Sequence, residues 1–263
     1  MSLSESIEEF VSERRFLISV IFPAVGAVMF LGSAEGILPD ILSFNPLLIL
    51  AGVSVMRLPL VAGLAPVTDR DTTVALLAVS LYAYIIEFVG IKTGWPYGEF
   101  LYEIPLGPMV SGVPIGLPLF FVPLVLNAFL LATLSGFTSI RNRLPATVAA
   151  VLLVDLALDP AAVSLGVWSY TGGVFHGVPL SNFAGWILSA SISTLIIEAG
   201  FRNIDLESRL LETDYMLDDL VSFQFLWGSI NLYYGNIIPV VSVLVLSLAL
   251  WRTEKFNFAF EES

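Results

Sequence analysis

Four carboxylates lie inside stretches of the sequence that are otherwise apolar: Glu87, Asp155, Asp159 and Glu198. An ionisable side chain at membrane depth costs roughly 3 kcal/mol or more, so each is a functional candidate unless it is paired. Glu198 has Arg202 four residues later, at the spacing of a helical ion pair, and we interpret it as structural. The other three acids remain candidates for chemistry.

Asp155 and Asp159 are four residues apart, so they share one side of a helix and lie about 6 Å apart along its axis. Pro160 follows Asp159 and frees the carbonyl of Leu156 from its helical hydrogen bond, which predicts a kink with room for water. An alternative interpretation is that Asp159 only satisfies the kinked backbone. Glu87 falls near the end of another apolar stretch, beside a segment crowded with Gly, Pro, Trp and Tyr.

Two segments of this crowded kind occur, at 87–114 and at 166–182. Each passes from aromatic and glycine residues into Gly-Val-Pro and then into a new apolar run, and proline suits the first turn of a helix. We interpret the segments as outer elbows that join two related helix pairs, although Gly-Val-Pro is also a common helix start. Irregular backbone near a membrane must be buried in protein or line a polar cavity, so both elbows are predicted to wall one site.

The two elbows supply polar and aromatic side chains that would position a substrate or water. They are Trp95, Tyr97, Glu99, Tyr102, Trp168, Tyr170, His176 and Asn182. Aromatic residues at this level usually form an interfacial belt, and a lone loop histidine is more often a hydrogen-bonding residue than a catalyst. Their concentration beside buried acids favours a functional site.

The chemistry that fits these residues is addition of water to an alkene. A carboxylic acid in apolar surroundings resists ionisation and remains a proton donor, and aromatic faces stabilise a nearby cation. Such groups suit protonation of an isolated alkene to a tertiary carbocation, followed by capture of water. We expect Asp159 or Glu87 to donate the proton, with Asp155 beside them. Trp95 and Trp168 are expected to flank the carbocation. The residues expected to position the water are Tyr97, His176 and Asn182.

The elements that position these residues are predicted to be membrane helices. Of the 263 residues, 57% are hydrophobic and 13% are charged, whereas a soluble domain is about a quarter charged. Apolar runs of about 15 to 22 residues recur along the chain, long enough to cross a membrane as helices. We predict an all-α polytopic bundle in a single membrane domain, 1–263. The spans are expected near 17–34, 45–62, 72–90, 113–134, 146–166, 183–200 and 236–251, with a weaker eighth at 217–233.

Basic residues decide between seven and eight spans, because cytoplasmic loops collect Lys and Arg. With the amino end inside and eight crossings, ten of the eleven basic residues fall inside and only Lys92 falls outside. Seven crossings would move the last two basic residues outside. We therefore expect eight spans in the cell membrane, with both termini cytoplasmic and 201–219 as a cytoplasmic loop.

Composition also excludes several classes of function. The chain has no cysteine, which rules out disulfides, thiolate catalysis and Cys-ligated metals. Its 23 acidic residues against 11 basic ones argue against a nucleic-acid partner and fit a salt-rich cytosol. No phosphate-binding loop or hydride-cofactor fingerprint is visible, so we expect neither a cofactor nor a metal site.

Two long stretches resemble a known family. They are EFVGIKTGWPYGEFLYEIPLGPMVSGVPIGLP and ALDPAAVSLGVWSYTGGVFHGVPLSNFAGW. With the many-span layout, they resemble the membrane carotenoid hydratases of the bisanhydrobacterioruberin hydratase type, over roughly residues 80 to 200. The resemblance implies cofactor-independent addition of water across the terminal C=C of an acyclic C50 carotenoid, from bisanhydrobacterioruberin to bacterioruberin, in a salt-loving archaeon. The expected partners are the acyclic carotenoid, membrane lipid and other membrane enzymes of the carotenoid pathway.

Two other functions stay open at this point. An intramembrane prenyltransferase would use the D-x-x-x-D spacing of Asp155 and Asp159 for Mg²⁺ and diphosphate, but its second aspartate pair would be Asp69 and Asp71 on a cytoplasmic loop. A transporter or carotenoid-binding scaffold is favoured by paired helix repeats and helices broken at polar residues. A retinal-binding photoreceptor needs a buried lysine, and both lysines of the chain fall at membrane edges.

Overall fold

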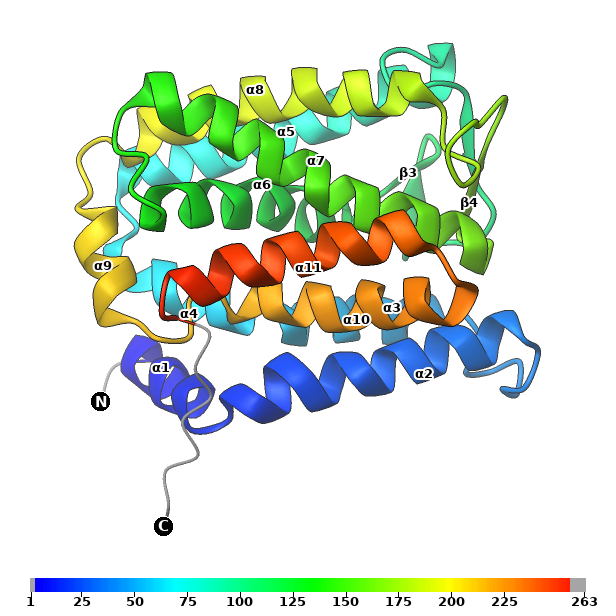
Figure 1. The fold of residues 1–263 in the computed structure, drawn as a ribbon, viewed down its shortest axis with the longest axis horizontal. Helices are drawn as coiled ribbons and strands as arrows, with labels where there is room; N and C mark the ends of the chain where they lie inside the picture. The colour runs from blue at the N-terminus through cyan, green and yellow to red at the C-terminus, as the bar shows by residue number, and fades with distance from the viewer. Residues whose placement is uncertain (1–2, 256–263) are drawn as a thin grey trace.

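The computed structural model describes residues 3–255, which form a bundle of helices that run lengthwise side by side (Figure 1). In chain order the helices are α1 (Leu3–Glu13), the π-helix η1 (Leu17–Ile21), α2 (Phe22–Ala34), α3 (Pro46–Met56), α4 (Leu58–Leu64), the 3-10 helix η2 (Ala65–Val67), α5 (Arg70–Thr93), α6 (Leu117–Leu134), α7 (Ile140–Leu165), α8 (Leu180–Phe201), α9 (Leu206–Glu212), α10 (Asp218–Tyr234) and α11 (Ile237–Arg252). Four short strands are β1 (Phe100–Tyr102), β2 (Met109–Val110), β3 (Val113–Pro114) and β4 (Trp168–Tyr170). The predicted all-α class is confirmed.

Most of each of the eight stretches predicted to cross the membrane is helical, although Val113–Pro114 at the start of the fourth stretch form β3 and Arg57 interrupts the second. Among the described residues, five helices are long and apolar enough to do so: Leu17–Ala34, Arg70–Thr93, Leu117–Leu134, Ile140–Leu165 and Leu180–Phe201. A sixth is added if Pro46–Met56 and Leu58–Val67, bent by 43° at their junction, count as one span. Helix α11, with 16 residues, is apolar but too short, whereas α10, with 17 residues, is both short and less apolar, so their crossing stays a prediction.

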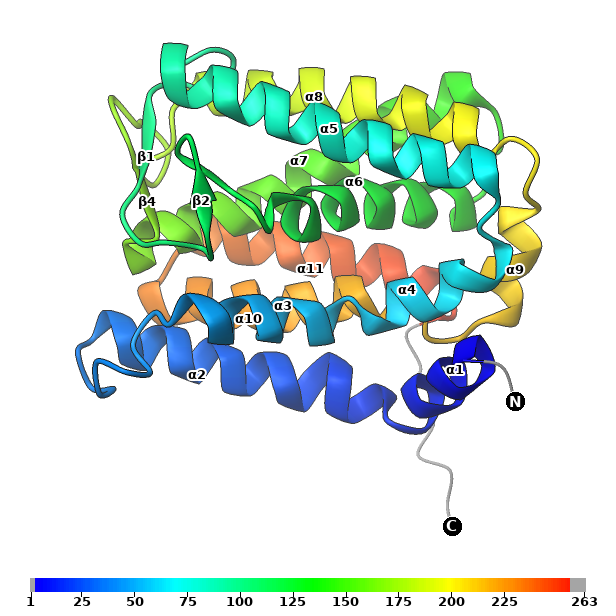
Figure 2. The same cartoon turned by 180° about the vertical axis from the view of Figure 1, so that it is seen from behind.

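The connections between the long helices alternate between the two ends of the bundle (Figures 1 and 2). One end, which we call the α9 end, carries α1, α9 and the last turn of α11. The other end, which we call the elbow end, carries the four strands and the turn between α10 and α11. The chain therefore reverses direction at each of these connections (Figures 1 and 2), and that every passage crosses the membrane stays a prediction.

Local sequence explains where two of the helices begin. The Asn45 side chain accepts hydrogen bonds from the backbone N–H groups of Leu47 and Leu48, at 3.0 and 3.3 Å, ahead of α3. Asp69 likewise accepts the Thr72 backbone N–H at 2.8 Å ahead of α5, and this bond holds the pKa of Asp69 below its usual value. Both residues satisfy amide donors that a first helical turn leaves unpaired.

The elbows have other bounds than predicted because α5 and α8 extend into them, whereas α6 begins only at Leu117, after the predicted end of the first elbow at 114. Helix α5 continues past Glu87 and ends at Gly94, whose positive φ of 73° glycine adopts without penalty. The first elbow therefore covers 94–116 and the second covers 166–179. They meet in an antiparallel ladder of β1 and β4, in which Tyr102 lies opposite Trp168. That the two elbows belong to related helix pairs stays a prediction.

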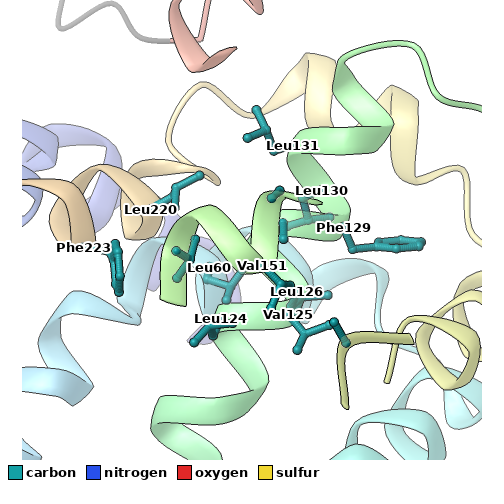
Figure 3. Packing of buried hydrophobic residues seen from close by; sticks show 14 of the residues in the cluster. Leu60, Leu124, Val125, Leu126, Phe129, Leu130, Leu131, Val151, Leu220 and Phe223 are labelled. Atoms are coloured by element: carbon teal, nitrogen blue, oxygen red, sulfur yellow. The ribbon is translucent and has the colours of Figure 1, made fainter. Parts of the chain in front are cut away.

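Helix α6 lies at the centre of the bundle and supplies much of its buried core. Figure 3 shows Leu124 and Phe129 of α6 among Val151 of α7, Leu60 of α4 and Leu220 of α10. Because lipid is as apolar as these side chains, close packing rather than escape from water holds such helices together. The resulting rigid frame surrounds a cavity that begins beneath the elbows.

Candidate functional site

A cavity with an empty volume of about 1320 Å³, its opening included, lies among α2, α3, α5, α6, α7, α8, α10 and both elbows. Its walls are mostly apolar and aromatic. Polar side chains line it in two places, with Glu87 and Asp159 beneath the elbows and Arg57 and Asn127 farther in. A large apolar cavity with a few polar groups is the usual form of a site for an apolar ligand.

Asp159 is held by two donors on a single oxygen. The Tyr170 hydroxyl donates to Asp159 Oδ2 at 2.7 Å, and Asn182 Nδ2 donates to the same oxygen at 2.6 Å. Asn182 Nδ2 also donates to Asp155 Oδ2 at 3.1 Å, so one amide group joins the two acids. Their i, i+4 spacing on α7 places both on the side that faces α8. Asp159 lines the cavity, whereas Asp155 is fully buried behind it.

Glu87 reaches the same cavity from α5. The Tyr102 hydroxyl donates to Glu87 Oε1, and the Tyr102 ring meets the Trp168 ring edge to face, with centroids 6.2 Å apart. The β1–β4 ladder also places Phe100 opposite Tyr170. The ladder thus positions both phenols, one on each acid.

Both phenols remain protonated and act as donors. Burial, followed by the charge of Glu87, raises the pKa of Tyr102 well above its usual value. Burial, followed by the charge of Asp159, does the same for the pKa of Tyr170. Because the carboxyl oxygens that face the phenols accept hydrogen bonds, an acid proton on Glu87 or Asp159 belongs on the other oxygen.

No lysine or arginine among the described residues forms an ion pair with Glu87, Asp155 or Asp159. Glu198, interpreted from the sequence as the partner of Arg202, pairs instead with Arg143 at 2.5 Å. The reason is that α7 and α8 pack side by side, which brings the Arg143 guanidinium across to α8. The predicted partner of Glu198 is therefore wrong, and its structural role stays a prediction, now supported by an ion pair between α7 and α8.

The comparisons with known proteins identify the family of the chain. Residues 44–250 match the family model described as carotenoid biosynthesis protein. The chain belongs to the carotenoid biosynthesis protein family. A curated relative, the bisanhydrobacterioruberin hydratase of Haloarcula japonica, is 53% identical over 260 residues, which cover 97% of this chain and 89% of the relative. No solved structure matches the chain. The predicted resemblance is thus confirmed, over a longer stretch than residues 80 to 200.

Seven of the residues proposed from the sequence line one cavity in this family member. They are Glu87, Tyr97, Tyr102, Asp159, Trp168, Tyr170 and Asn182. Tyr97 is buried, and its hydroxyl lies 2.7 Å from Ser189 Oγ rather than on an acid. The structure thus gathers the acids and most of the elbow side chains at one place.

Three elbow residues do not reach the cavity, so the roles expected for them do not fit. Trp95 is 58% exposed in the turn that follows α5, and Glu99 is exposed just after it. His176 is exposed at the tip of the second elbow, where its ring packs on Phe175 with centroids 4.8 Å apart. Sequence alone could not distinguish these tips from the inner walls of the elbows.

The cavity also contains residues that the sequence analysis did not select. Trp186 stacks on Phe121, with ring centroids 5.2 Å apart, and Arg57 and Asn127 form the inner polar end. Arg57 was assigned to a cytoplasmic loop, although it falls within the predicted span 45–62. An arginine inside a membrane span needs a buried acid as its counter-charge. The position of Arg57 in the sequence was therefore enough to predict an ion pair within the bundle.

Proposed function

We propose that this chain is an enzyme of carotenoid biosynthesis that adds water across the terminal C=C of an acyclic carotenoid, with bisanhydrobacterioruberin as substrate and bacterioruberin as product. Membership of the family and the name of the relative from Haloarcula japonica support the reaction class. The observation that carries the proposal is that Glu87 and Asp159, from different helices, line one aromatic cavity.

Asp159 is the residue that donates the proton. Asp155 and Asp159 share the amide of Asn182 and have no cationic partner among the described residues. Two neighbouring carboxyls without a counter-charge cannot both be ionised, so the pair retains a proton. Because Asp159 alone of the two lines the cavity, the proton reaches the substrate from Asp159. Asp155 is then a positioning residue.

Donation of this proton to the terminal alkene forms a C–H bond and leaves a tertiary carbocation. Trp168 and Trp186 line the cavity, and their aromatic rings stabilise the positive charge. A water molecule then forms the C–O bond, and Glu87 accepts the proton that this water releases. The alkene gains one water, and proton transfer from Glu87 back to Asp159 restores the enzyme.

Two features of the geometry bear on the roles of Glu87 as the base and of the attacking water. The Tyr102 hydroxyl on Glu87 Oε1 stabilises a carboxylate, the form that a base requires. The Trp168 indole N–H is buried without a partner among the described residues, and Trp168 lines the cavity beside Tyr102. This donor has no accessible surface in the structure, so it would bind the attacking water only once the indole ring moves toward the cavity.

The test is to express the chain in membranes with bisanhydrobacterioruberin and to follow the product by mass spectrometry in water enriched in heavy oxygen. Each reacted end should gain one water that carries the label. Asp159→Asn and Glu87→Gln should each lower the rate roughly 10²- to 10⁴-fold, the usual contribution of a general acid or base.

Two exposed acids provide matched controls. Glu99→Gln changes an elbow acid outside the cavity, and Asp71→Asn changes an acid at the opposite end of α5, so both variants should retain activity. Full activity of both cavity variants would remove the assignment of the acids. Pigment that binds but is recovered unchanged by the wild-type chain would favour a carotenoid-binding scaffold instead.

The positions of the aspartates do not support the alternative function of an intramembrane prenyltransferase. Asp69 and Asp71 lie at the start of α5, and Asp159 lies near the opposite end of the bundle (Figure 2). Within residues 3–255, no group of three or more His, Cys, Asp or Glu is placed to hold a metal ion. A diphosphate site would require two acidic clusters that face each other.

A further inference from the structure

Helix α3 is a thin part of the cavity wall, on the outer face of the bundle in front of α10 (Figure 2). Of its eleven residues, all within the described part of the chain, only Met56 is buried. Ile49 and Val53, four residues apart on one side of the helix, line the cavity. Leu47 and Ala51 are exposed on the opposite side. A single helix therefore separates the cavity from the surroundings of the bundle here.

Leu50 joins α3 to the first elbow. A Cβ atom at Gly107 would lie 2.7 Å from Leu50 Cδ1, and one at Gly116 would lie 2.5 Å from Leu50 Cδ2. Any larger residue at either position would overlap with Leu50, so the two glycines form a socket that the leucine fills. Among the described residues, no hydrogen bond links Pro46–Met56 to this elbow. Apolar packing therefore holds α3 against the elbow.

Arg57 anchors the other end of α3. Arg57 Nη1 donates to Asp219 Oδ1, and Arg57 Nε donates to the Leu119 carbonyl at 3.0 Å. Asn127 Nδ2 donates to the second oxygen of Asp219 at 2.6 Å, so the acid is itself held in place. The chain bends by 43° between α3 and the helix that follows it. Polar bonds thus fix α3 beside a bend, whereas its contact with the elbow is apolar.

The contact between Leu50 and the socket lies at the edge of the cavity. Ile49, Leu106 and Leu117 line the cavity, and each is the chain neighbour of one residue of this contact. A polyene does not reach the cavity through water, because exposure of so much apolar surface to water is unfavourable. It must pass sideways from lipid, and the boundary between α3 and the first elbow has apolar residues on both sides.

We propose that α3 is a gate, and that an apolar polyene enters the cavity from lipid between α3 and the first elbow when Leu50 leaves its socket. The ion pair of Arg57 stays intact while the rest of α3 swings outward about the bend. The same movement releases the product. This inference rests on the proposed function, because it concerns how the substrate of that cavity reaches it.

The experiment locks the gate with a disulfide, since the chain has no cysteine of its own. In the double variant Leu50→Cys with Gly116→Cys, the sulfur at position 50 takes the place of Leu50 Cγ, which lies 3.9 Å from the Cβ position at Gly116. A small shift of α3 toward the elbow then closes the bridge. Gly116 has a φ of −73°, which cysteine also adopts.

The matched control is the double variant Gly228→Cys with Val243→Cys. The Cβ position at Gly228 lies 3.9 Å from Val243 Cβ, a separation that a disulfide spans. This pair joins α10 to α11, and neither residue lines the cavity. The control bridge should leave the hydration rate unchanged.

Vesicles that contain the gate variant are oxidised either before or after bisanhydrobacterioruberin is added, and hydration is followed by mass spectrometry. When oxidised first, the variant should hydrate the pigment roughly 10-fold more slowly, or slower still, than after reduction, because a closed gate leaves the polyene in lipid. When oxidised after loading, it should complete a single turnover of the bound pigment and then stop.

Equal rates for the oxidised and reduced gate variant would overturn the inference and leave the proposed function intact. Loss of hydration whatever the order of addition would mean that the bridge distorts the site, and would also overturn it. Pigment uptake that oxidation slows, together with no hydration by the wild-type chain, would contradict the proposed function alone. Circular dichroism of the bound polyene measures the uptake.

Titration of free thiols shows whether the bridge between positions 50 and 116 forms. If it does not, Leu50→Ala gives the test, because it empties the socket and should raise the rate of pigment uptake several-fold. Leu244→Ala, which shortens an exposed leucine of α11, is its control and should leave uptake unchanged. An uptake rate for Leu50→Ala equal to that of the control would overturn the inference.

Discussion

At the scale of single residues, the acids were predictable and most of their partners were not. Glu87, Asp155 and Asp159 stand out because a charged side chain is costly in an apolar helix. Tyr170 and Asn182 were selected only as members of an elbow. The contact of Tyr170 with Asp159 depends on how the elbow folds back over α7, and that of Asn182 depends on how α8 packs against α7; no local pattern in the sequence specifies either.

The hydroxyl of Tyr170 offers a test of how the acid is positioned. Tyr170→Phe removes one of two donors to Asp159 Oδ2 and should lower kcat roughly 10- to 100-fold, with little change in KM, because the ring that faces the substrate remains. Steady-state hydration rates in membranes provide the measurement.

Tyr82→Phe is the matched control for this prediction. It removes a phenol that bonds Ser189 outside the cavity, and should leave kcat unchanged. Equal losses in the two variants would show that the Tyr170 hydroxyl acts through stability alone.

At the scale of elements, apolar runs predicted every long helix but not where each one ends. The first elbow was expected to begin at Glu87, because glycines and aromatic residues follow closely. The structure continues α5 to Thr93, since Gly94 is the first residue with the left-handed conformation that ends a helix. The break at Arg57 between α3 and α4 was missed, because a continuous apolar run conceals a bend.

The contact between α5 and α8 provides a prediction about these elements. A Cβ atom added at Gly200 would overlap with Cβ of Ala75, so Gly200→Ala should separate the two helices and destabilise the protein by about 1–3 kcal/mol. The loss should appear as a lower midpoint of thermal unfolding in detergent.

Gly52→Ala is the control for this substitution. The nearest atom to a Cβ at Gly52 is 4.0 Å away on Phe22, and the residue lies within α3, so alanine should be neutral or stabilising. A midpoint for Gly200→Ala that is no lower than that for Gly52→Ala would contradict the close packing.

At the scale of the whole molecule, the loop charges predicted eight crossings with both ends of the chain on one side of the membrane. The structure is compatible with this prediction. The long helices alternate in direction, and α1 and the end of α11 lie at the α9 end (Figure 1). We propose that this end is cytoplasmic and that all eight stretches cross the membrane. The side of the membrane could be inferred only from Lys and Arg counts, because the packing of helices is the same in either orientation.

The absence of cysteine makes this topology testable with single-cysteine variants. Val174 and Tyr233, 74% and 55% exposed at the elbow end, should react as cysteines with a membrane-impermeant maleimide on intact cells. A cysteine at Ser139, in the exposed turn between α6 and α7, should react only after the membrane is permeabilised. Protection of the Tyr233 variant in intact cells would show that α10 and α11 do not cross.

The ion pair of Arg57 with Asp219 has a consequence for how the protein is made. Arg57 leaves the ribosome 162 residues before its acid does, which at about 5–20 residues per second is a wait of roughly 8–30 s. Throughout that interval the bent α3–α4 segment carries a cation without its counter-ion, and lipid offers it none. One of the earliest segments to be inserted thus becomes stable only when one of the last arrives.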